Sequence, residues 1–311
     1  AIPIIISCIA QYWLKIYGPL NLFNGLIIWF NKPFTSMDQG VAGLFTNQNY
    51  TGIWLAALWP FCIYYFLKEK SSKTKKYFIL SFTILTLYFV FLTLSRSAIF
   101  GVLISLPLIF SIKLLVKSII IISIIFLFLY LIYSTFSLNA FALINQFSPN
   151  ILKVLISKIT DINLHNLNNL PRIIIWENAI NFIKNKPWLG FGPGLFPLLF
   201  VGADVILRAN HAHNIILQLA FDFGLPLSIL LSLFVFALLL KSYRKVFNNL
   251  KIDKKYINID KYWFTSSLIV LFSQINDITY FDGRIGVLIW ILLAGLKCII
   301  EDKNYSSSQC N

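Results

Sequence analysis

Two histidines separated by one residue are the clearest candidates for chemistry in this chain. His211 and His213 belong to the run His211-Ala212-His213-Asn214, which directly precedes a long apolar stretch that predicts a helix. The positive end of a helix dipole disfavours imidazolium, so His213 is expected to be a neutral imidazole that can act as a general base. The alternatives are an ordinary hydrogen-bonding loop histidine and an H-x-H metal site, although the sequence places no third ligand nearby.

Two arginines occupy positions that helix or membrane stability does not explain. Arg96 interrupts an apolar stretch. A guanidinium at membrane depth is costly, so it indicates a functional role. The alternative is that the side chain of Arg96 extends to the membrane interface and has only a structural role. Arg172 follows Pro171 in the first turn of a predicted helix, where its charge opposes the helix dipole. It could hold an anion there, or it could pair with Glu177 or Asp161 as a solvated loop residue.

Two further segments are polar or rich in glycine. Residues 186–194 carry glycines that permit tight turns, and since no strand precedes them we interpret them as an architectural corner rather than a nucleotide loop. Asp277, Asp282 and Arg284 surround the last outer turn, where they could line a site or form a solvated turn. No acidic cluster or cysteine pair has metal-ligand spacing, so these residue types give no sign of a metal or other cofactor.

Membrane-spanning helices are the elements expected to position these residues. The chain has 311 residues, of which 58% are hydrophobic and only 12% are charged, and this is too little charge to cover a soluble surface. The net charge of +14 does not indicate nucleic acid, because Lys and Arg concentrate in the cytoplasmic loops of membrane proteins.

The apolar stretches predict an all-α bundle of about eight transmembrane helices, each near 20 residues long. The stretch 77–110 is too long for one span, and residues 93–97 divide it into two. Residues 20–30 are too short for a span and predict an interfacial helix. The remaining predicted spans are 2–17, 51–67, 118–136, 215–240, 262–278 and 285–300.

Placing all short basic loops in the cytoplasm gives one consistent topology and three regions. Residues 1–138 hold the first spans, with an outer segment at 18–49. Residues 139–213 form one large outer loop that contains a predicted amphipathic helix at 172–185. Residues 214–311 hold the last spans and a short cytoplasmic tail.

Five segments, in this order, resemble the O-antigen ligase/polymerase family. Each segment is short, but their order and the long outer loop before the last one make the set specific. They are Gly43–Asn49, Leu94–Ser97, Arg172–Ala179 with Trp176, Pro187–Phe196, and His211–Asn214 followed after a nine-residue spacer by Gly224. Leu227 departs from the Gly, Thr or Tyr that ligases commonly carry, which leaves polymerase relatives equally open.

The resemblance implies a metal-independent glycosyltransferase of the bacterial inner membrane whose active site faces the periplasm. Such an enzyme moves a glycan from undecaprenyl diphosphate to the hydroxyl of a glycan, lipid A core or protein acceptor, with the lipid bilayer as its surroundings. His213 would then be the base, and Arg96 and Arg172 would bind the diphosphate. The implied substrate contacts are His211, Asn214, Asn47, Asn49 and Trp176.

Two other classes of protein remain open at this point. A lipid-linked oligosaccharide flippase or other export transporter would need repeated halves and charges at the bilayer midplane, and the sequence shows neither. A structural or sensor protein would have an outer loop without a pocket. If the protein is a transferase, Arg96, Arg172 and His213 should converge at one outward-facing site.

Overall fold

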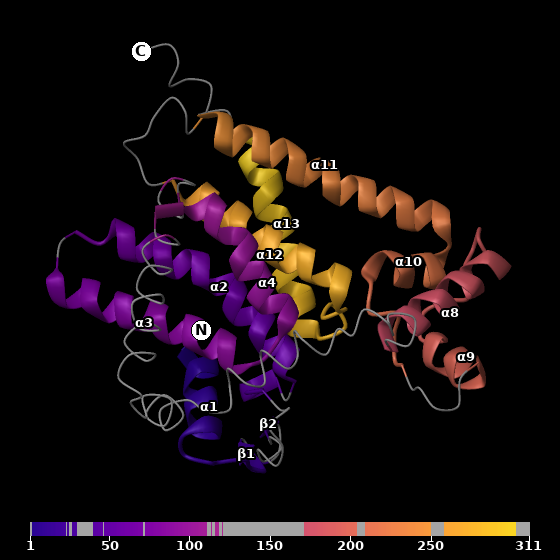
Figure 1. Ribbon diagram of the computed structural model, residues 1–311, viewed down its shortest axis with the longest axis horizontal. Coiled ribbons are helices and arrows are strands. Elements are labelled where there is room, and N and C mark those ends of the chain that lie inside the picture. The colour runs from indigo at the N-terminus through magenta and orange to yellow at the C-terminus, as the bar shows by residue number, and fades with distance from the viewer. Residues whose placement is uncertain are drawn as a thin grey trace, which may run out of the picture.

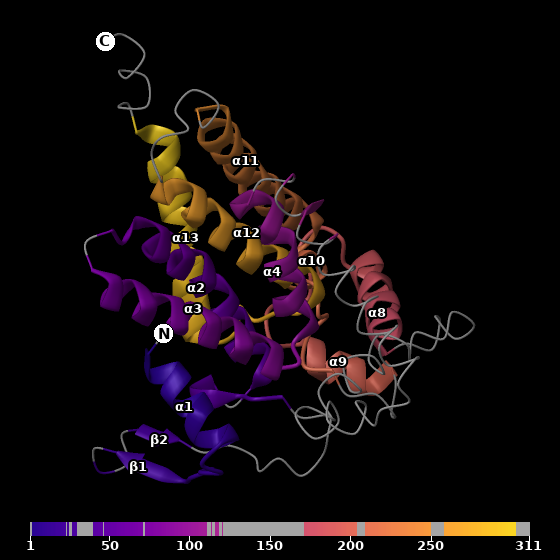
Figure 2. The ribbon, with the colours of Figure 1, turned by 60° about the vertical axis from the view of Figure 1, so that its left-hand side comes forward.

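The computed structural model of the protein is a helical bundle with a smaller helical module at one side (Figures 1 and 2). It describes residues 2–22, 24, 27–29, 40–45, 47–70, 72–110, 113, 116–117, 120, 171–203, 209–249 and 258–302. The helices are α1 (Ile2–Tyr12), α2 (Gln48–Lys68), α3 (Lys73–Leu92), α4 (Arg96–Ile109), α8 (Pro171–Asn185), α9 (Phe196–Ala203), α10 (Ile215–Phe223), α11 (Leu225–Asn249), α12 (Ile259–Asn276) and α13 (Gly283–Glu301), with a short 3₁₀ helix at Gly43–Phe45.

Within the described residues, four helices are long and apolar enough to cross a membrane, namely α2, α3, α11 and α13. Helices α1 and α4 are apolar but shorter. Helix α12 has 18 residues, but it is rich in serine, threonine and glutamine. The predicted span at 118–136 and residues 139–170 of the predicted outer loop lie outside the described residues. The described chain is thus a multi-pass helical membrane protein, and the number of eight spans stays a prediction.

The prediction of one span at 215–240 was wrong, because the helix breaks at Gly224. Gly224 has a φ of 87°, a left-handed conformation that L side chains rarely adopt. Pro226 follows in the first turn of α11, where its missing N–H leaves no hydrogen bond unmade. Glycine and proline together therefore end α10 and start α11 in a new direction.

The interfacial helix predicted for residues 20–30 was also wrong. Leu20–Leu22 (β1) and Ile27–Trp29 (β2) form an antiparallel hairpin in which Leu20 pairs with Trp29. Asn24 in the connection has a φ of 54°, which asparagine tolerates better than most residues. Asn24-Gly25 is a hairpin-turn signal, and it outweighs the apolar character of the segment.

Two other predictions are confirmed. The stretch 77–110 divides where expected, since α3 ends at Leu92 and α4 begins at Arg96 after the N-cap Ser95. The helix predicted at 172–185 is α8, which begins one residue earlier. It buries Ile175, Ala179 and Ile183 on one face at four-residue spacing, as an amphipathic helix should.

Two hydrophobic cores hold the molecule together. The larger core lies in the bundle, where α2 packs against α3, α4 and α12, and α13 packs against α11 and α12. The smaller core joins α8, α9 and α10, with Phe221 at its centre between Phe182, Phe191 and Phe196. Helix α10 is packed against α8 on one side and α11 on the other, so it connects this module to the bundle (Figure 1).

Candidate functional site

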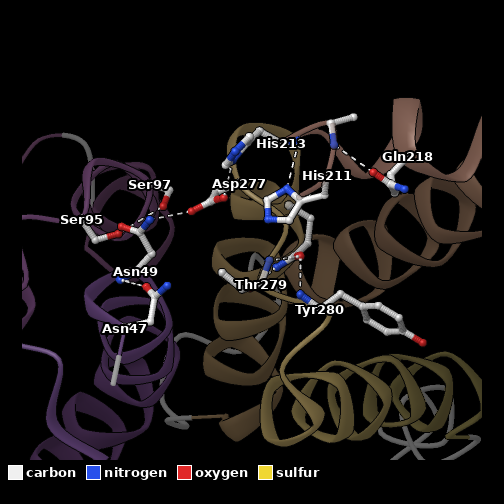
Figure 3. A network of polar contacts seen from close by, with 12 residues as sticks. Asn47, Asn49, Ser95, Ser97, His211, His213, Gln218, Asp277, Thr279 and Tyr280 are labelled. Carbon is white, nitrogen blue, oxygen red and sulfur yellow. Dashed lines mark hydrogen bonds and ion pairs between the residues drawn. The ribbon is translucent and has the colours of Figure 1, made fainter. Parts of the chain in front are cut away.

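A buried carboxylate ties three distant segments of the chain together at one site (Figure 3). Asp277, which is only 5% exposed, follows the last residue of α12. Its Oδ1 lies 2.9 Å from Nδ1 of His213, and its Oδ2 accepts a 2.7 Å hydrogen bond from Nδ2 of Asn49. The start of α2, the turn before α10 and the end of α12 therefore meet at both oxygens of one side chain.

The turn that carries His213 is held by the start of α10. Oδ1 of Asn214 accepts hydrogen bonds from the backbone N–H groups of Ile216 at 2.9 Å and Leu217 at 3.2 Å, so Asn214 is the N-cap. His213 itself has a φ of 51°, a conformation that costs a side-chain-bearing residue about 1–3 kcal/mol and persists only where its surroundings fix it. Such strain is typical of functional sites.

The side chains of Asn47 and Asn49 form different hydrogen bonds. Asn47 caps α2, because its Oδ1 accepts the backbone N–H of Asn49 at 2.8 Å. The side chain of Asn49 is directed at Asp277 instead. Asn47 and Asn49 were predicted to contact the substrate. In the structure, Asn47 starts α2 and Asn49 places its amide on the buried carboxylate.

The turn after Asp277 is fixed by a buried glutamine. Oε1 of Gln274 accepts the backbone N–H groups of Thr279 at 3.1 Å and Tyr280 at 3.2 Å, while its Nε2 donates to Oγ1 of Thr279 at 2.7 Å. Asp282, at the other end of the turn, caps α13 and pairs with Arg284 at 2.6 Å. Of the three polar residues that the sequence indicated here, Asp277 alone reaches the histidines.

Charges at the site act on one another strongly enough to shift pKa values. Burial lowers the pKa of the Arg172 guanidinium, with Arg96 acting in the same direction and Asp277 against it. Burial, the charge of His213 and that of Arg172 lower the pKa of His211 to about 4, against the effect of Asp277. Arg172 therefore lies within electrostatic reach of Arg96, His211 and Asp277.

Asp277 stays ionised despite its burial. Burial raises the pKa of this carboxyl, but the hydrogen bond from His213 and its electrostatic interaction, followed by the charge of Arg172, outweigh it. The net pKa lies below the usual value for aspartate. A buried anion is thus available beside the imidazole of His213.

Neither arginine is neutralised within the part of the chain that is described. Arg96 is exposed at the first turn of α4, and Arg172 is half-buried at the first turn of α8. Neither one forms an ion pair with a described residue, so the expected alternative pairing of Arg172 with Glu177 is not observed. Asp161, the other alternative partner, lies outside the described residues.

Trp176 lies one turn after Arg172, with its ring packed against the smaller core. Its Nε1 is buried without a hydrogen-bond partner among the described residues. This packing accounts for an aromatic residue at this position, and it leaves one polar atom for a ligand or a water molecule.

The glycine-rich corner is an architectural element, as predicted, and it docks on the end of α10. The N–H of Phe191 donates to the carbonyl of Phe221 at 2.7 Å, and their rings stack at 5.0 Å. A Cβ on Gly224 would lie 2.1 Å from the carbonyl oxygen of Trp188, and one on Gly190 would lie 2.5 Å from that of Phe221. Both glycines are therefore required for the backbones to touch.

Asp277 also supplies the third metal-ligand group that the sequence did not reveal. Ligand atoms of His211, His213 and Asp277 lie within 4.8 Å of one another and could surround a cation. The positive charge of Arg172 acts on this same cluster, and Nδ1 of His213 already shares a hydrogen with the carboxylate. Both features favour a hydrogen-bonded His–Asp pair over a divalent ion.

The family comparison covers this site. The family model described as O-antigen ligase matches residues 81–232, a segment that runs from α3 into α11 and contains Arg96, Arg172, His213 and Gly224. No curated protein matches the chain significantly. Over this segment, which contains Arg96, Arg172 and His213, the chain is similar to the O-antigen ligase family.

Proposed function

We propose that the protein is a metal-independent glycosyltransferase of the bacterial inner membrane. It would move a glycan from undecaprenyl diphosphate to an acceptor hydroxyl at the periplasmic face, as an O-antigen ligase or as an O-antigen or exopolysaccharide polymerase. The observation that carries this proposal is the hydrogen-bonded pair of His213 and Asp277 within electrostatic reach of Arg172, on which the charge of Arg96 acts in turn.

His213 is the general base of the proposed reaction. Because Asp277 is ionised, Nδ1 of His213 donates to its carboxylate, and the lone pair is left on Nε2. Nε2 takes the proton of the acceptor hydroxyl as its oxygen attacks the anomeric carbon. Asp277 stabilises the imidazolium that forms, in the manner of the acid in a Ser–His–Asp triad. General base catalysis of this kind contributes about 10²–10⁴-fold.

The two arginines bind the diphosphate in this scheme. As the acceptor oxygen bonds to the anomeric carbon, the bond from that carbon to the diphosphate oxygen breaks, and undecaprenyl diphosphate leaves with the electron pair. Guanidinium groups bind phosphate oxygens bidentately, and two like charges, of which that of Arg172 is half-buried, are stabilised by an anion between them. The lowered pKa of Arg172 beside Arg96 supports such an anion site.

A transfer assay with the purified full chain tests the proposal. The substrates are an undecaprenyl-diphosphate-linked glycan and an acceptor, in the presence of EDTA. We expect His213→Ala to abolish transfer and His165→Ala, the same change at the third histidine of the chain, to leave it normal. Normal turnover by His213→Ala would refute the assignment. Movement of lipid-linked glycan across the bilayer without any transfer product would favour the flippase instead.

Two cellular experiments test the proposed location and acceptor. A cysteine placed at residue 213 in a variant without other cysteines should react with a maleimide that cannot cross the inner membrane. Labelling from the cytosol only would refute the periplasmic site. After deletion of the gene, electrophoresis of surface polysaccharide and glycoproteins separates a ligase, a polymerase and a protein-glycosylating enzyme by which product is lost.

A further inference from the structure

A cavity of about 360 Å³ adjoins the histidine pair on the side of His211. This volume lies within the range of about 300–1,000 Å³ that small-molecule sites occupy. The cavity is bordered by the first turn of α2, the glycine corner with α9, the turn before α10 and the turn before α13. Its lining residues are Tyr50, Gly194, Phe196, Pro197, Asn210, His211, Gln218 and Phe281.

The lining has the chemistry of a carbohydrate site. None of these eight described residues is a lysine, arginine, aspartate or glutamate, so the cavity offers little to a diphosphate. It provides two accessible aromatic rings, from Tyr50 and Phe281, together with uncharged polar groups, while Phe196 is fully buried behind them. Aromatic faces pack against the apolar C–H faces of a sugar ring, and a few placed polar groups bind its hydroxyls.

His211 is prepared to donate a hydrogen bond into this space. Its Nδ1 accepts the backbone N–H of His213 at 3.2 Å, so the neutral ring carries its proton on Nε2. The ring is held between His213, at a centroid distance of 4.2 Å, and Phe281, at 5.8 Å. No residue of the described chain accepts from Nε2, and the low pKa of His211 keeps the ring neutral at pH 7.

The other polar side chains of the lining are either held by hydrogen bonds within the protein or available to a ligand. Gln218 is held, because its Oε1 accepts the N–H of Ala212 at 2.9 Å and its Nε2 donates to Asp222 at 2.9 Å. The side chains of Tyr50 and Asn210 make no hydrogen bond to any residue that the structure describes. The cavity therefore has a fixed wall and a small set of donors and acceptors for a ligand.

We propose that this cavity binds a sugar ring of the acceptor and that Nε2–H of His211 donates to one of its oxygens. The inference rests on the proposed function and specifies where the acceptor enters. Since the rings of His211 and His213 touch, a sugar in the cavity lies beside the base that must deprotonate it. The arginines that would hold the donor diphosphate are absent from the lining.

Steady-state kinetics of the full chain, with acceptor and donor varied separately, tests the proposal. Asn210→Ala and His211→Phe should each raise the KM for the acceptor about 3- to 10-fold, the effect of one hydrogen bond, and leave the KM for the donor unchanged. His211→Gln, which keeps an N–H donor, should restore part of the acceptor affinity. Leu198→Ala, at an exposed position of α9 outside the cavity, is the matched control.

Direct binding separates this proposal from the proposed function. Calorimetry with a soluble acceptor glycan on His213→Ala should show binding that Asn210→Ala weakens in that same background, even if no transfer occurs. A rise in donor KM with unchanged acceptor KM would assign the cavity to the donor and overturn the proposal. Unchanged KM values for both substrates in Asn210→Ala and His211→Phe would overturn it as well.

Discussion

Replacing Asp277 by asparagine is the sharpest test of the catalytic geometry. The substitution keeps the shape of a side chain that is only 5% exposed and removes its charge. The carbonyl oxygen of the introduced amide can still accept from Nδ1 of His213, and Asn49 can turn its own amide to meet the new NH₂ group. The hydrogen bonds therefore survive, but the imidazolium formed during transfer loses its buried anion.

The size of the effect follows from that lost charge. A hydrogen bond to a charged group contributes about 1.5–3 kcal/mol, against about 0.5–1.5 kcal/mol for a neutral one. If the introduced amide keeps the neutral bond, about 1–2 kcal/mol of transition-state stabilisation is lost, and kcat falls about 5- to 30-fold. If the amide instead donates to Nδ1, the lone pair on Nε2 is lost and kcat falls much further, as in the corresponding change of a Ser–His–Asp triad.

The assay is transfer of glycan by the full chain, with kcat measured at saturating donor and acceptor. Asp282→Asn is the matched control, since Asp282 lies in the same turn and pairs with Arg284 instead. A kcat within twofold of the parent protein would refute the proposed pairing.

Three further outcomes are expected. Arg172→Lys keeps a positive charge but loses the planar fork, so the KM for the lipid-linked donor should rise about tenfold, and unchanged donor affinity would exclude bidentate binding. Gly224→Ala places a Cβ 2.1 Å from the carbonyl oxygen of Trp188 at a φ of 87°, and should lower the melting temperature markedly, whereas Gly283→Ala meets nothing within 4 Å and should not. Transfer should be unaffected by EDTA and by added Zn²⁺ at stoichiometric amounts, and a metal requirement would favour the cation alternative for His211, His213 and Asp277.

The lengths of the apolar runs predicted most of the described helices. The prediction failed where turn residues determine the local structure. Runs of apolar residues placed α2, α3, α4 and α13 close to their observed positions. Length alone could not show that Gly224 and Pro226 divide one run into two helices, or that Asn24-Gly25 turns another into a hairpin. Both signals were present in the sequence, since each consists of two turn residues inside an otherwise apolar segment.

The site could be predicted in part, and the missing part required tertiary structure. The sequence indicated three site residues by their type, because their charge or polarity had no structural explanation at those positions. These residues are His213, Arg96 and Arg172. Asp277 lies 64 residues from His213, and a carboxylate at the end of an outer turn has no local feature that distinguishes it from a solvated one. The protonation of His211 likewise depends on a backbone N–H that only the folded turn supplies.

The nine-residue helix α10 explains why the spacing between His213 and Gly224 matters. At its start, Asn214 caps the helix directly after His213. At its end, Gly224 allows the glycine corner to dock, and the stack of Phe191 on Phe221 joins that corner to the core of α8. Since Arg172 is in the first turn of α8, the length of α10 sets the separation of the proposed base from the proposed diphosphate ligand. A helix of nine residues is about 13 Å long, and each added residue would turn its start by about 100°. The spacing is therefore a geometric requirement that couples the two halves of the site.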